Sequence, residues 1–425
     1  MCSDTTRSLS AIASDNDYDP NSMPVAKARD YIRAFLTPVK TVERVHLRAA
    51  LGRVLAQPVR STINVPSHDN SAMDGYAFRF SDLEAGTEST LKVVGSSFAG
   101  KPFPGAVGSR EAVRIMTGGV MPSGCDTVVM QERVRAAEGR VHVPAGQQQG
   151  ANVRYAGGDI KSGEVVFEPG QIVLPAELGM IASLGIGEVS VYRRLRVAFF
   201  STGDELVPIG GTLASGQIYD SNRYTIYGML TRLGVDAIDM GAIRDDPSAI
   251  EGAFVQAAQA ADVVITSGGV SVGEADFVKQ MLAKLGDVLF WKIAMKPGRP
   301  LAFGKIGQAH FFGLPGNPVS AMVTFYEFVR EALLVLMGVP QPRPLPTLKA
   351  VCTSAVKKAP GRTEFQRGVL EQGSDGQWTV RVTGDQSSGI LSSMSRADCF
   401  IVLPDAQGNT PAGATVDVQL LAGLI

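Results

Sequence analysis

The stretch RVAFFSTGDEL, Arg196–Leu206, opens the most regular part of this 425-residue chain. Its apolar run VAFFS has the length and composition of a strand that is buried on both faces. From there strand and helix patterns alternate up to Met337, which predicts a doubly wound α/β sheet of parallel strands covered by helices on both faces. The predicted strands are Val197–Ser201, Val235–Met240, Val263–Ser267, Val288–Ile293, Pro300–Gly304 and His310–Leu314, and the predicted helices are Ser221–Leu233, Pro247–Ala260, Asp276–Leu285 and Pro318–Met337.

The rest of the chain has a different character on each side of this block. Short β-rich pieces between Gly and Pro turns precede it, helical patterns lie on either side of those pieces, and strand patterns follow a proline-rich linker. The sequence therefore predicts a multidomain α/β plus β protein. Its predicted parts are a disordered polar tail (1–22), a discontinuous helical domain (23–57 and 162–194), an inserted β domain (58–161), the α/β domain (195–339) and a C-terminal β-barrel (346–425).

The composition excludes several classes of protein. Lys and Arg number 40 against 41 Asp and Glu, so no overall positive field exists to hold a nucleic acid. The four cysteines form no CxxC pair, and no His or Cys has the spacing of a zinc ligand. No apolar run approaches the roughly 20 residues that cross a bilayer, and no signal core opens the chain. We expect a reduced, cytoplasmic protein that binds neither nucleic acid nor membrane.

Polar residues follow the predicted carboxyl ends of the α/β strands, where ligands of open α/β sheets bind. The carboxylates of Glu205, Asp245 and Asp276 follow three of those segments. Mg²⁺ is commonly held by one or two carboxylates together with substrate phosphates. These three residues are therefore candidate metal ligands.

Cationic and glycine-rich segments follow other strands and suit an anionic ligand. Ser267-Gly268-Gly269 lets the backbone approach an anion closely, and Lys296 and Arg299 supply positive charge. Asn317 is placed to cap the last helix and aim its free N–H groups at an oxyanion. Each feature alone has an ordinary explanation as a turn, but their joint placement favours an anion site. No P-loop and no GxGxxG motif follows a strand, so the ATPase and dinucleotide interpretations lose their main signal.

A second informative segment lies in the predicted β domain. HDNSAMDGYA (His68–Ala77) is polar and contains two aspartates, and RIMTGG (Arg114–Gly119) follows later. Asp69 has a simple explanation as a local cap. The whole segment lacks a strand period, so some further role is required to explain its order.

These segments resemble the MoeA family, the molybdopterin molybdenumtransferases, which is related to the E domain of gephyrin. The resemblance runs from Met23 to the C-terminus, although Ser387-Ser388-Gly389 stands where close relatives often have GSH. The motifs that carry it are DNSAMDGYA, RIMTGG, VVMQE, FSTGDEL, GQIYDSN, IRDDP, ITSGGVSVGEADF, KPGRPLAFG, GLPGNPVSA and GRTEFQRGVL.

The resemblance implies an elongated four-domain subunit whose α/β domain binds molybdopterin and is similar to the MoaB and MogA adenylyltransferases. It implies a homodimer whose cleft lies between the α/β domain of one subunit and the inserted β domain of the other. The implied reaction takes adenylyl-molybdopterin and molybdate, cleaves the phosphoanhydride with the help of Mg²⁺, releases AMP and leaves molybdenum on the dithiolene. The molybdopterin adenylyltransferase is a further expected partner.

The matching motifs also imply site residues. The implied metal ligands are Glu205, Asp245 and Asp276, and the implied catalytic residues are Asp74, Thr117, Glu205 and Lys296. The implied substrate-binding residues are Arg154, Asp159, Ser267, Gly268, Gly269, Lys292, Pro315, Asn317, Pro318, Ser320, Arg367 and Ser388.

Two alternatives stand beside this interpretation. An adenylyltransferase would share the fold of residues 195–338, but such proteins usually consist of that domain alone. A gephyrin-like scaffold would bind a peptide in its dimer groove, and no long linker or fused domain in the sequence indicates one.

Overall fold

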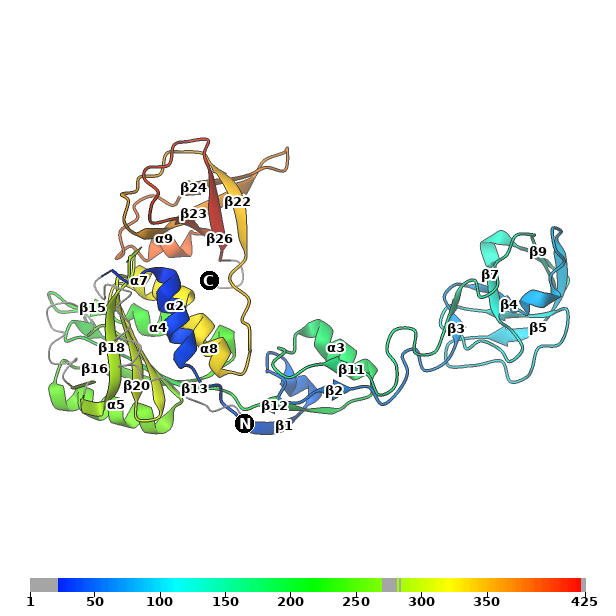
Figure 1. Cartoon of the computed structure of the whole chain (residues 1–425), viewed down its shortest axis with the longest axis horizontal. Coiled ribbons are helices and arrows are strands. Elements are labelled where there is room, and N and C mark those ends of the chain that lie inside the picture. The colour runs from blue at the N-terminus through cyan, green and yellow to red at the C-terminus, as the bar shows by residue number, and fades with distance from the viewer. Residues whose placement is uncertain (1–21, 270–280, 283, 422–425) are drawn as a thin grey trace. The chain divides into compact units, whose positions relative to one another are not determined.

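The computed structural model describes residues 22–269, 281–282 and 284–421. The chain divides into two compact units, and each is described here by itself (Figure 1). The first comprises Met1–Glu43, Gly52–Ala56 and Ser190–Ile425, and the second Arg44–Leu51 and Gln57–Val189. In the part of the chain that is described, no helix has the length and apolar character needed to cross a membrane.

The first unit contains a six-stranded sheet in the order β16-β13-β17-β21-β20-β18. Strand β13 pairs in parallel with both β16 and β17, and β17 pairs in parallel with β21. The chain runs from β13 out to β16 and then returns to β17 on the other side of β13, so the topological switch point lies between β13 and β17. The strands are β13 (Arg196–Thr202), β16 (Asp236–Ile243), β17 (Val263–Ser267), β18 (Gly286–Lys292), β20 (Pro300–Ile306) and β21 (Ala309–Leu314).

One edge of this sheet differs from the all-parallel prediction. Strand β20 runs antiparallel to β21, and β18 runs antiparallel to β20. Only Gly307 and Gln308 connect β20 to β21, and such a short connection joins antiparallel strands, whereas a parallel pair needs a crossover. The sheet is therefore mixed.

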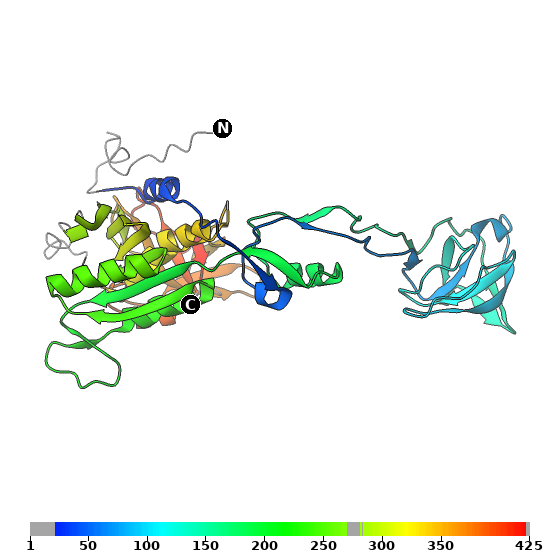
Figure 2. The same ribbon diagram turned by 90° about the horizontal axis from the view of Figure 1, so that it is seen from below.

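Helices cover both faces of the sheet, as the apolar strands predict (Figures 1 and 2). On one face Phe200 packs edge-to-face against Phe254 of α5, with ring centroids 5.2 Å apart. On the other face Phe199 contacts Tyr227 of α4, with centroids 6.5 Å apart. The doubly wound α/β prediction is confirmed. The predicted helix Asp276–Leu285 falls mostly outside the described residues. The helices described in this unit are α2 (Val25–Phe35), α4 (Ser221–Leu233), α5 (Pro247–Ala260), α7 (Pro318–Thr324), the π-helical turn η4 (Phe325–Val329), α8 (Arg330–Leu336) and α9 (Ser392–Ser395).

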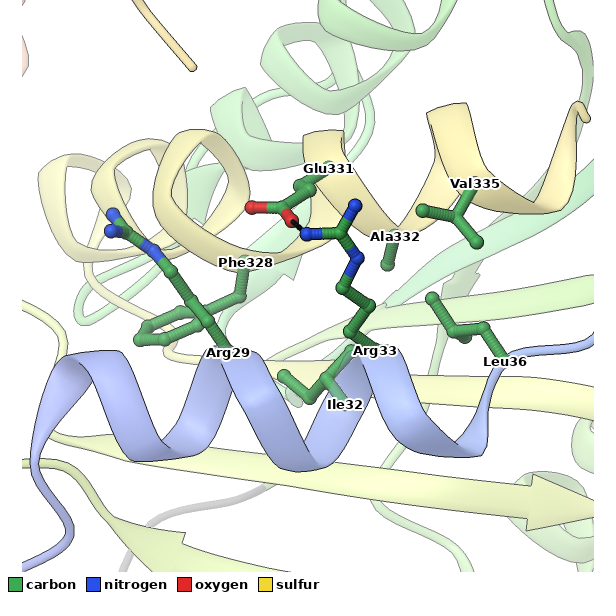
Figure 3. Close-up of a pocket in the computed structure, with 8 residues that line it drawn as sticks. All are labelled: Arg29, Ile32, Arg33, Leu36, Phe328, Glu331, Ala332 and Val335. Carbon is green, nitrogen blue, oxygen red and sulfur yellow. Dashed lines mark ion pairs between the residues drawn. The ribbon is translucent and has the colours of Figure 1, made fainter. Parts of the chain in front are cut away.

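Helix α2 packs against the continuous α7-η4-α8 segment. The Arg29 guanidinium forms an ion pair with the buried Glu327 carboxylate and donates from Nε to the Glu327 carbonyl at 2.9 Å. Burial raises the pKa of Glu327, and the Arg29 charge opposes that shift. Figure 3 shows Arg33 reaching Glu331 beside a hollow of about 10 Å³. That volume suits about one water molecule, so this hollow is no ligand site.

The predicted C-terminal barrel is confirmed. Five strands follow one another in the order β23-β24-β22-β26-β25, and β25 pairs back to β23, which closes the barrel. The short strand β19 (Met295–Lys296), which leaves the α/β sheet after β18, adds to β23 in parallel. The barrel strands are β22 (Thr347–Cys352), β23 (Thr363–Gln372), β24 (Trp378–Val382), β25 (Cys399–Leu403) and β26 (Thr415–Leu420).

The second unit contains the predicted β domain. Its six-stranded sheet has the order β7-β4-β6-β5-β9-β8, and Phe78, Leu91, Val129 and Val141 form part of its core. The strands are β4 (Gly75–Phe78), β5 (Ser89–Ser97), β6 (Glu111–Ile115), β7 (Thr127–Met130), β8 (Arg135–Ala137) and β9 (Arg140–Val143), with the short helices η2 (Phe80–Asp82) and η3 (Gln131–Arg133).

The remaining elements are short. Helix α3 (Pro175–Ser183) begins with proline at its first position, as predicted, and packs on the 3₁₀ helix η1 (Leu47–Ala50). Two-stranded sheets pair β1 (Val42–His46) with β12 (Glu188–Tyr192), β2 (Val59–Arg60) with β11 (Val165–Phe167), β3 (Asn70–Ser71) with β10 (Val153–Arg154), and β14 (Leu206–Val207) with β15 (Ile218–Tyr219).

Candidate functional site

A cavity of about 600 Å³ opens at the carboxyl ends of β13, β17 and β21. This is the topological switch point, where open α/β sheets bind their ligands. Its lining comes from the ends of β13, β17 and β21 and the residues that follow them, from β14 and β15, from the starts of β20, α4 and α7, and from a loop of the barrel. The residues are Ser201, Thr202, Glu205, Leu206, Ile218, Tyr219, Asp220, Ser221, Asn222, Ser267, Gly268, Pro300, Pro315, Gly316, Asn317, Pro318, Ser320, Gly389 and Leu391. Of the predicted site residues, the structure brings together Glu205, Ser267, Gly268, Pro315, Asn317, Pro318 and Ser320.

The glycine after β17 is required by close packing. Gly268 has φ +92°, and a Cβ there would lie 2.6 Å from the Thr202 carbonyl oxygen. Gly269 follows with φ +67°. The Gly268 N–H donates to the Leu314 carbonyl at 3.2 Å, so this group fixes the loop instead of facing a ligand.

Asn222 joins three of the loops that line the cavity. Its Nδ2 donates to Ser267 Oγ at 2.7 Å and to the Gly316 carbonyl at 2.6 Å. Ser267 is 2% exposed and donates from Oγ to the Pro315 carbonyl at 3.4 Å. The hydroxyl predicted to bind substrate is thus held by hydrogen bonds at the floor of the cavity.

The sequence reasoning missed two polar residues of the lining, Asp220 and Thr202. Asp220 is 2% exposed, and its Oδ1 accepts hydrogen bonds from Ser201 Oγ at 3.0 Å and the Arg223 N–H at 3.2 Å. Among the described residues, Asp220 Oδ2 and Thr202 Oγ1 have no hydrogen-bond partner, although Oδ2 lies 3.5 Å from Arg223 Nε. Buried polar atoms are almost always satisfied, so Thr202 Oγ1 is available to a ligand or water, whereas Asp220 Oδ2 has the Arg223 guanidinium beside it. Asp220 stands in GQIYDSN, one of the motifs that carry the family resemblance, but the motif alone indicates no role for it.

Two acidic loops lie next to each other at this end of the sheet. The Asp245 N–H donates to Asp204 Oδ1 at 3.2 Å, which joins the loop after β16 to the loop after β13. Glu205 is exposed on the cavity lining, and no hydrogen bond or ion pair within the described ranges occupies its carboxylate. Asp276 lies outside the described residues.

The donor chemistry of these loops fits a divalent cation that is completed by a substrate. The described part of the chain contains no group of three or more His, Cys, Asp or Glu side chains able to enclose a metal by themselves. Mg²⁺ does not require such a group, because it keeps several waters and binds through one or two carboxylates plus substrate phosphates. Glu205 and Asp245 supply carboxylates of that kind.

The start of α7 partly differs from the expectation. Asn317 occupies the capping position and Pro318 the first helical position, as predicted, but the Asn317 side chain makes no capping hydrogen bond. The Val319 N–H instead donates to the Ser388 carbonyl at 3.2 Å. A barrel loop therefore satisfies one of the free N–H groups that were expected to face an anion.

The predicted cations lie in three different environments. The Lys296 ammonium lies 3.6 Å from the Glu364 carboxylate and is half exposed. Arg367 is 1% exposed, and it donates from Nε to Ser393 Oγ at 3.0 Å and from a terminal nitrogen to the Ser387 carbonyl at 2.9 Å. Burial lowers the pKa of Arg367 to about 10. Lys292 is half-buried at the end of β18. None of the three is part of the cavity lining.

In the β domain the structure joins Asp74 to Thr117. Asp74 Oδ1 accepts hydrogen bonds from the Thr117 N–H at 2.7 Å and from Thr117 Oγ1 at 2.8 Å. The backbone bond, followed by the hydroxyl bond, lowers the pKa of Asp74. Arg154 and Asp159 are exposed, and Arg154 on β10 pairs with Asn70 on β3. Asp69 Oδ1 accepts the Ala156 N–H at 2.7 Å, as a local cap does.

Comparison with known proteins assigns each part of the chain. Residues 23–185 match the MoeA N-terminal region (domain I and II), residues 198–335 match a probable molybdopterin binding domain, and residues 349–421 match the MoeA C-terminal region (domain IV).

Whole-chain relatives agree with these matches. The chain is 49% identical over 383 residues to the molybdopterin molybdenumtransferase of Haemophilus influenzae, covering 90% of this chain and 94% of the relative. It is 38% identical over 387 residues to that of a Nostoc species, covering 89% and 88%. The crystal structure of the molybdopterin biosynthesis moeA protein from Pyrococcus horikoshii OT3 superposes with a TM-score of 0.81 at 28% identity, covering 94% of this chain and 100% of the other. The chain therefore belongs to the MoeA family and is an enzyme of the molybdopterin molybdenumtransferase type.

Proposed function

We propose that this enzyme uses adenylyl-molybdopterin and molybdate. A water oxygen attacks the AMP phosphorus, so that the phosphoanhydride breaks and AMP leaves. Molybdate then binds the two dithiolene sulfurs and loses one oxygen, which leaves as water with the two thiol protons. The observation that carries the proposal is the cavity at the switch point, where Asp220 Oδ2 and Thr202 Oγ1 are buried without hydrogen-bond partners in the part of the chain that the structure describes. The cavity lies largely within residues 198–335, the part that matches a probable molybdopterin binding domain. Its volume of about 600 Å³ is in the range of small-molecule sites.

We assign Glu205, Asp245 and Asp276 to Mg²⁺. When bound there, the ion would neutralise phosphate charge and polarise the anhydride. The exposed Glu205 carboxylate, which no hydrogen bond or ion pair occupies within the described ranges, supports this assignment, and the Asp245 N–H bond to Asp204 brings a second acidic loop beside it.

The chain's own residues then bind and orient the substrate. Asn222 and Ser267 fix the floor of the cavity, and Gly268 allows the loop after β17 to approach the end of β13 closely. Lys296 stabilises the negative charge that develops on the leaving phosphate. Molybdate, a tetrahedral dianion, takes a neighbouring position among cationic groups. The enzyme acts as a cytoplasmic homodimer. Asp74 and Thr117 of the β domain contribute to the reaction.

The test is incubation of the full chain with adenylyl-molybdopterin, molybdate and Mg²⁺, with AMP measured by chromatography. We expect AMP release that depends on molybdate and is lost when Mg²⁺ is chelated. Absence of AMP with an active substrate preparation would overturn the proposal. A parallel incubation with molybdopterin and ATP tests the adenylyltransferase alternative, which requires the adenylylated product to appear.

A further inference from the structure

The barrel carries a buried carboxylate that the implied mechanism does not use. Glu364 on β23 is 3% exposed. Its Oε2 accepts a hydrogen bond from Gln366 Nε2 at 2.8 Å, and the same nitrogen donates to the Lys357 carbonyl at 2.9 Å. Its Oε1 lies 3.6 Å from the Lys296 ammonium. A buried carboxylate requires a counter-charge, and here that charge comes from the α/β domain.

The backbone brings the two residues together. The Thr363 N–H donates to the Ala294 carbonyl at 2.9 Å, and β19 pairs with β23 so that Lys296 stands directly beside Glu364. The segment that carries Lys296 is therefore an added strand of the barrel.

The same segment is packed tightly against α7 on its other side. Gly298 has φ +95°, and a Cβ there would lie 2.5 Å from Thr324 Oγ1 and 3.3 Å from the Ser320 carbonyl oxygen. Ser320 and Pro300 both line the cavity. The segment that carries Lys296 is therefore held between β23 and α7, and Pro300, which follows it, lines the cavity.

We propose that Glu364 is a positioning residue, which acts on the reaction by fixing the ammonium group of Lys296. The inference rests on the proposed function, in which Lys296 stabilises charge on the leaving phosphate. Lysine has a long flexible side chain, so a free ammonium would sample many positions. A cation that is already fixed when charge develops stabilises the transition state without further reorganisation.

The first test is Glu364→Gln, which keeps the shape and a hydrogen-bond acceptor but removes the charge. We expect kcat/KM for AMP release to fall about tenfold or more, since small displacements of a charge-stabilising group cost that much. The control is Glu371→Gln on the same strand, where an exposed carboxylate pairs with Arg381 at 3.4 Å. It should leave kcat/KM unchanged, and an equal loss in both variants would overturn the proposal.

A double-mutant cycle separates positioning from simple support of the fold. If Glu364 acts through Lys296, adding Glu364→Gln to Lys296→Ala lowers kcat/KM no further than Lys296→Ala alone. Independent, multiplying losses would show that Glu364 only supports the barrel. Should Glu364→Gln fail to fold, Glu364→Asp keeps the charge one methylene further back, and wild-type kcat/KM in that variant would contradict the proposal.

A measurement without substrate keeps this inference distinct from the proposed function. Lysine acylation read by mass spectrometry should modify Lys296 several-fold faster in Glu364→Gln than in the wild type, with Lys349, which pairs with Asp417, as the internal reference. Equal rates would overturn the pairing even if AMP is released. A wild-type chain that releases no AMP would instead remove the proposed function while leaving the pairing to this measurement.

Discussion

The carboxylates of Asp220 in the α/β-domain cavity and of Asp74 in the β domain are hydrogen-bonded to different extents. In the cavity, Asp220 Oδ2 and Thr202 Oγ1 are buried without hydrogen-bond partners among the residues described. In the β domain, the Asp74 carboxylate accepts two hydrogen bonds from Thr117 although neither residue is buried. The Asp220 carboxylate thus keeps one oxygen without a hydrogen bond, 3.5 Å from Arg223 Nε, whereas Thr117 holds the Asp74 carboxylate. Asn70 Oδ1, earlier in the β-domain segment, is also buried without a hydrogen-bond partner among the described residues.

Under the proposed function, this difference predicts two kinds of contribution to one reaction. Unsatisfied buried groups cost folding free energy that a bound ligand recovers, so they mark the place where substrate adds most to stability. A satisfied, exposed carboxylate costs little and presents a fixed charge. We therefore expect substitutions in the cavity to change turnover most, and substitutions around Asp74 to produce smaller, graded effects.

The largest effect should come from Glu205→Gln. This change removes a carboxylate from the cavity lining while keeping its size, and under the proposed function it removes a metal ligand. We expect AMP release to fall about 100-fold or more. The thermal midpoint should stay near that of the wild type, because the side chain is exposed.

The matched control for Glu205 lies on helix α5. Glu251 pairs with Lys284 at 2.9 Å and is not part of the cavity lining. Glu251→Gln should leave AMP release unchanged. If Glu205→Gln released AMP at the wild-type rate under saturating Mg²⁺, a carboxylate of the cavity lining would matter no more for turnover than one elsewhere in the domain. That result would contradict the prediction.

Periodic apolar segments made much of the fold predictable. The segments Ser221–Leu233, Pro247–Ala260 and Val263–Ser267 have the predicted bounds, because capping aspartates, a first-turn proline and a continuous apolar strand mark their ends locally. The predicted parallel orientation of β20 was wrong. A strand pattern does not indicate orientation, and the short Gly307-Gln308 connection makes β20 antiparallel to β21.

The site was less predictable than the fold. Position after a strand correctly brought Glu205, Ser267 and Asn317 to one cavity. Arg367 illustrates the limit, because its charge indicated anion binding while its donors hold Ser387 and Ser393 inside the barrel. Asp220 was overlooked because its burial depends on contacts with β13, which local sequence does not reveal.

The next effect separates the α/β domain from the β domain by pH. His310 on β21 is 5% exposed, and burial, assisted by the Lys305 charge, lowers its pKa to about 4, with Asp262 opposing the shift. The folded pKa lies below the ordinary value of 6.5, so the unfolded chain takes up the proton first. The free energy of unfolding therefore has its full value above pH 6.5. It decreases by about 3 kcal/mol as the pH falls towards 4.

Hydrogen exchange of peptides covering β20 and β21 measures this loss region by region. We expect protection to decrease between pH 6.5 and 4 in these strands and not in β4 or β6 of the β domain. His310→Phe should flatten the dependence, because an aromatic ring without a titrating nitrogen keeps the packing against Phe35. His46→Gln, at a side chain that is 86% exposed, serves as the control and should not change it.

The smallest effect should come from Thr117→Val in the β domain. This change removes the hydroxyl bond to Asp74 but leaves the backbone N–H, which is the larger cause of the lowered pKa. Because the folded pKa of Asp74 lies below its ordinary value of 3.8, its contribution to stability is present above that pH and is lost as the pH falls through the folded pKa. Thr117→Val should shrink this loss without abolishing it, as read from exchange protection of β4 and β6 below pH 4. Thr117→Ser keeps the hydroxyl and should behave as the wild type. If Thr117→Val instead lowered AMP release as far as Glu205→Gln does, the Thr117 hydroxyl would act on substrate directly. The expected difference between substitutions in the cavity and substitutions around Asp74 would then be wrong.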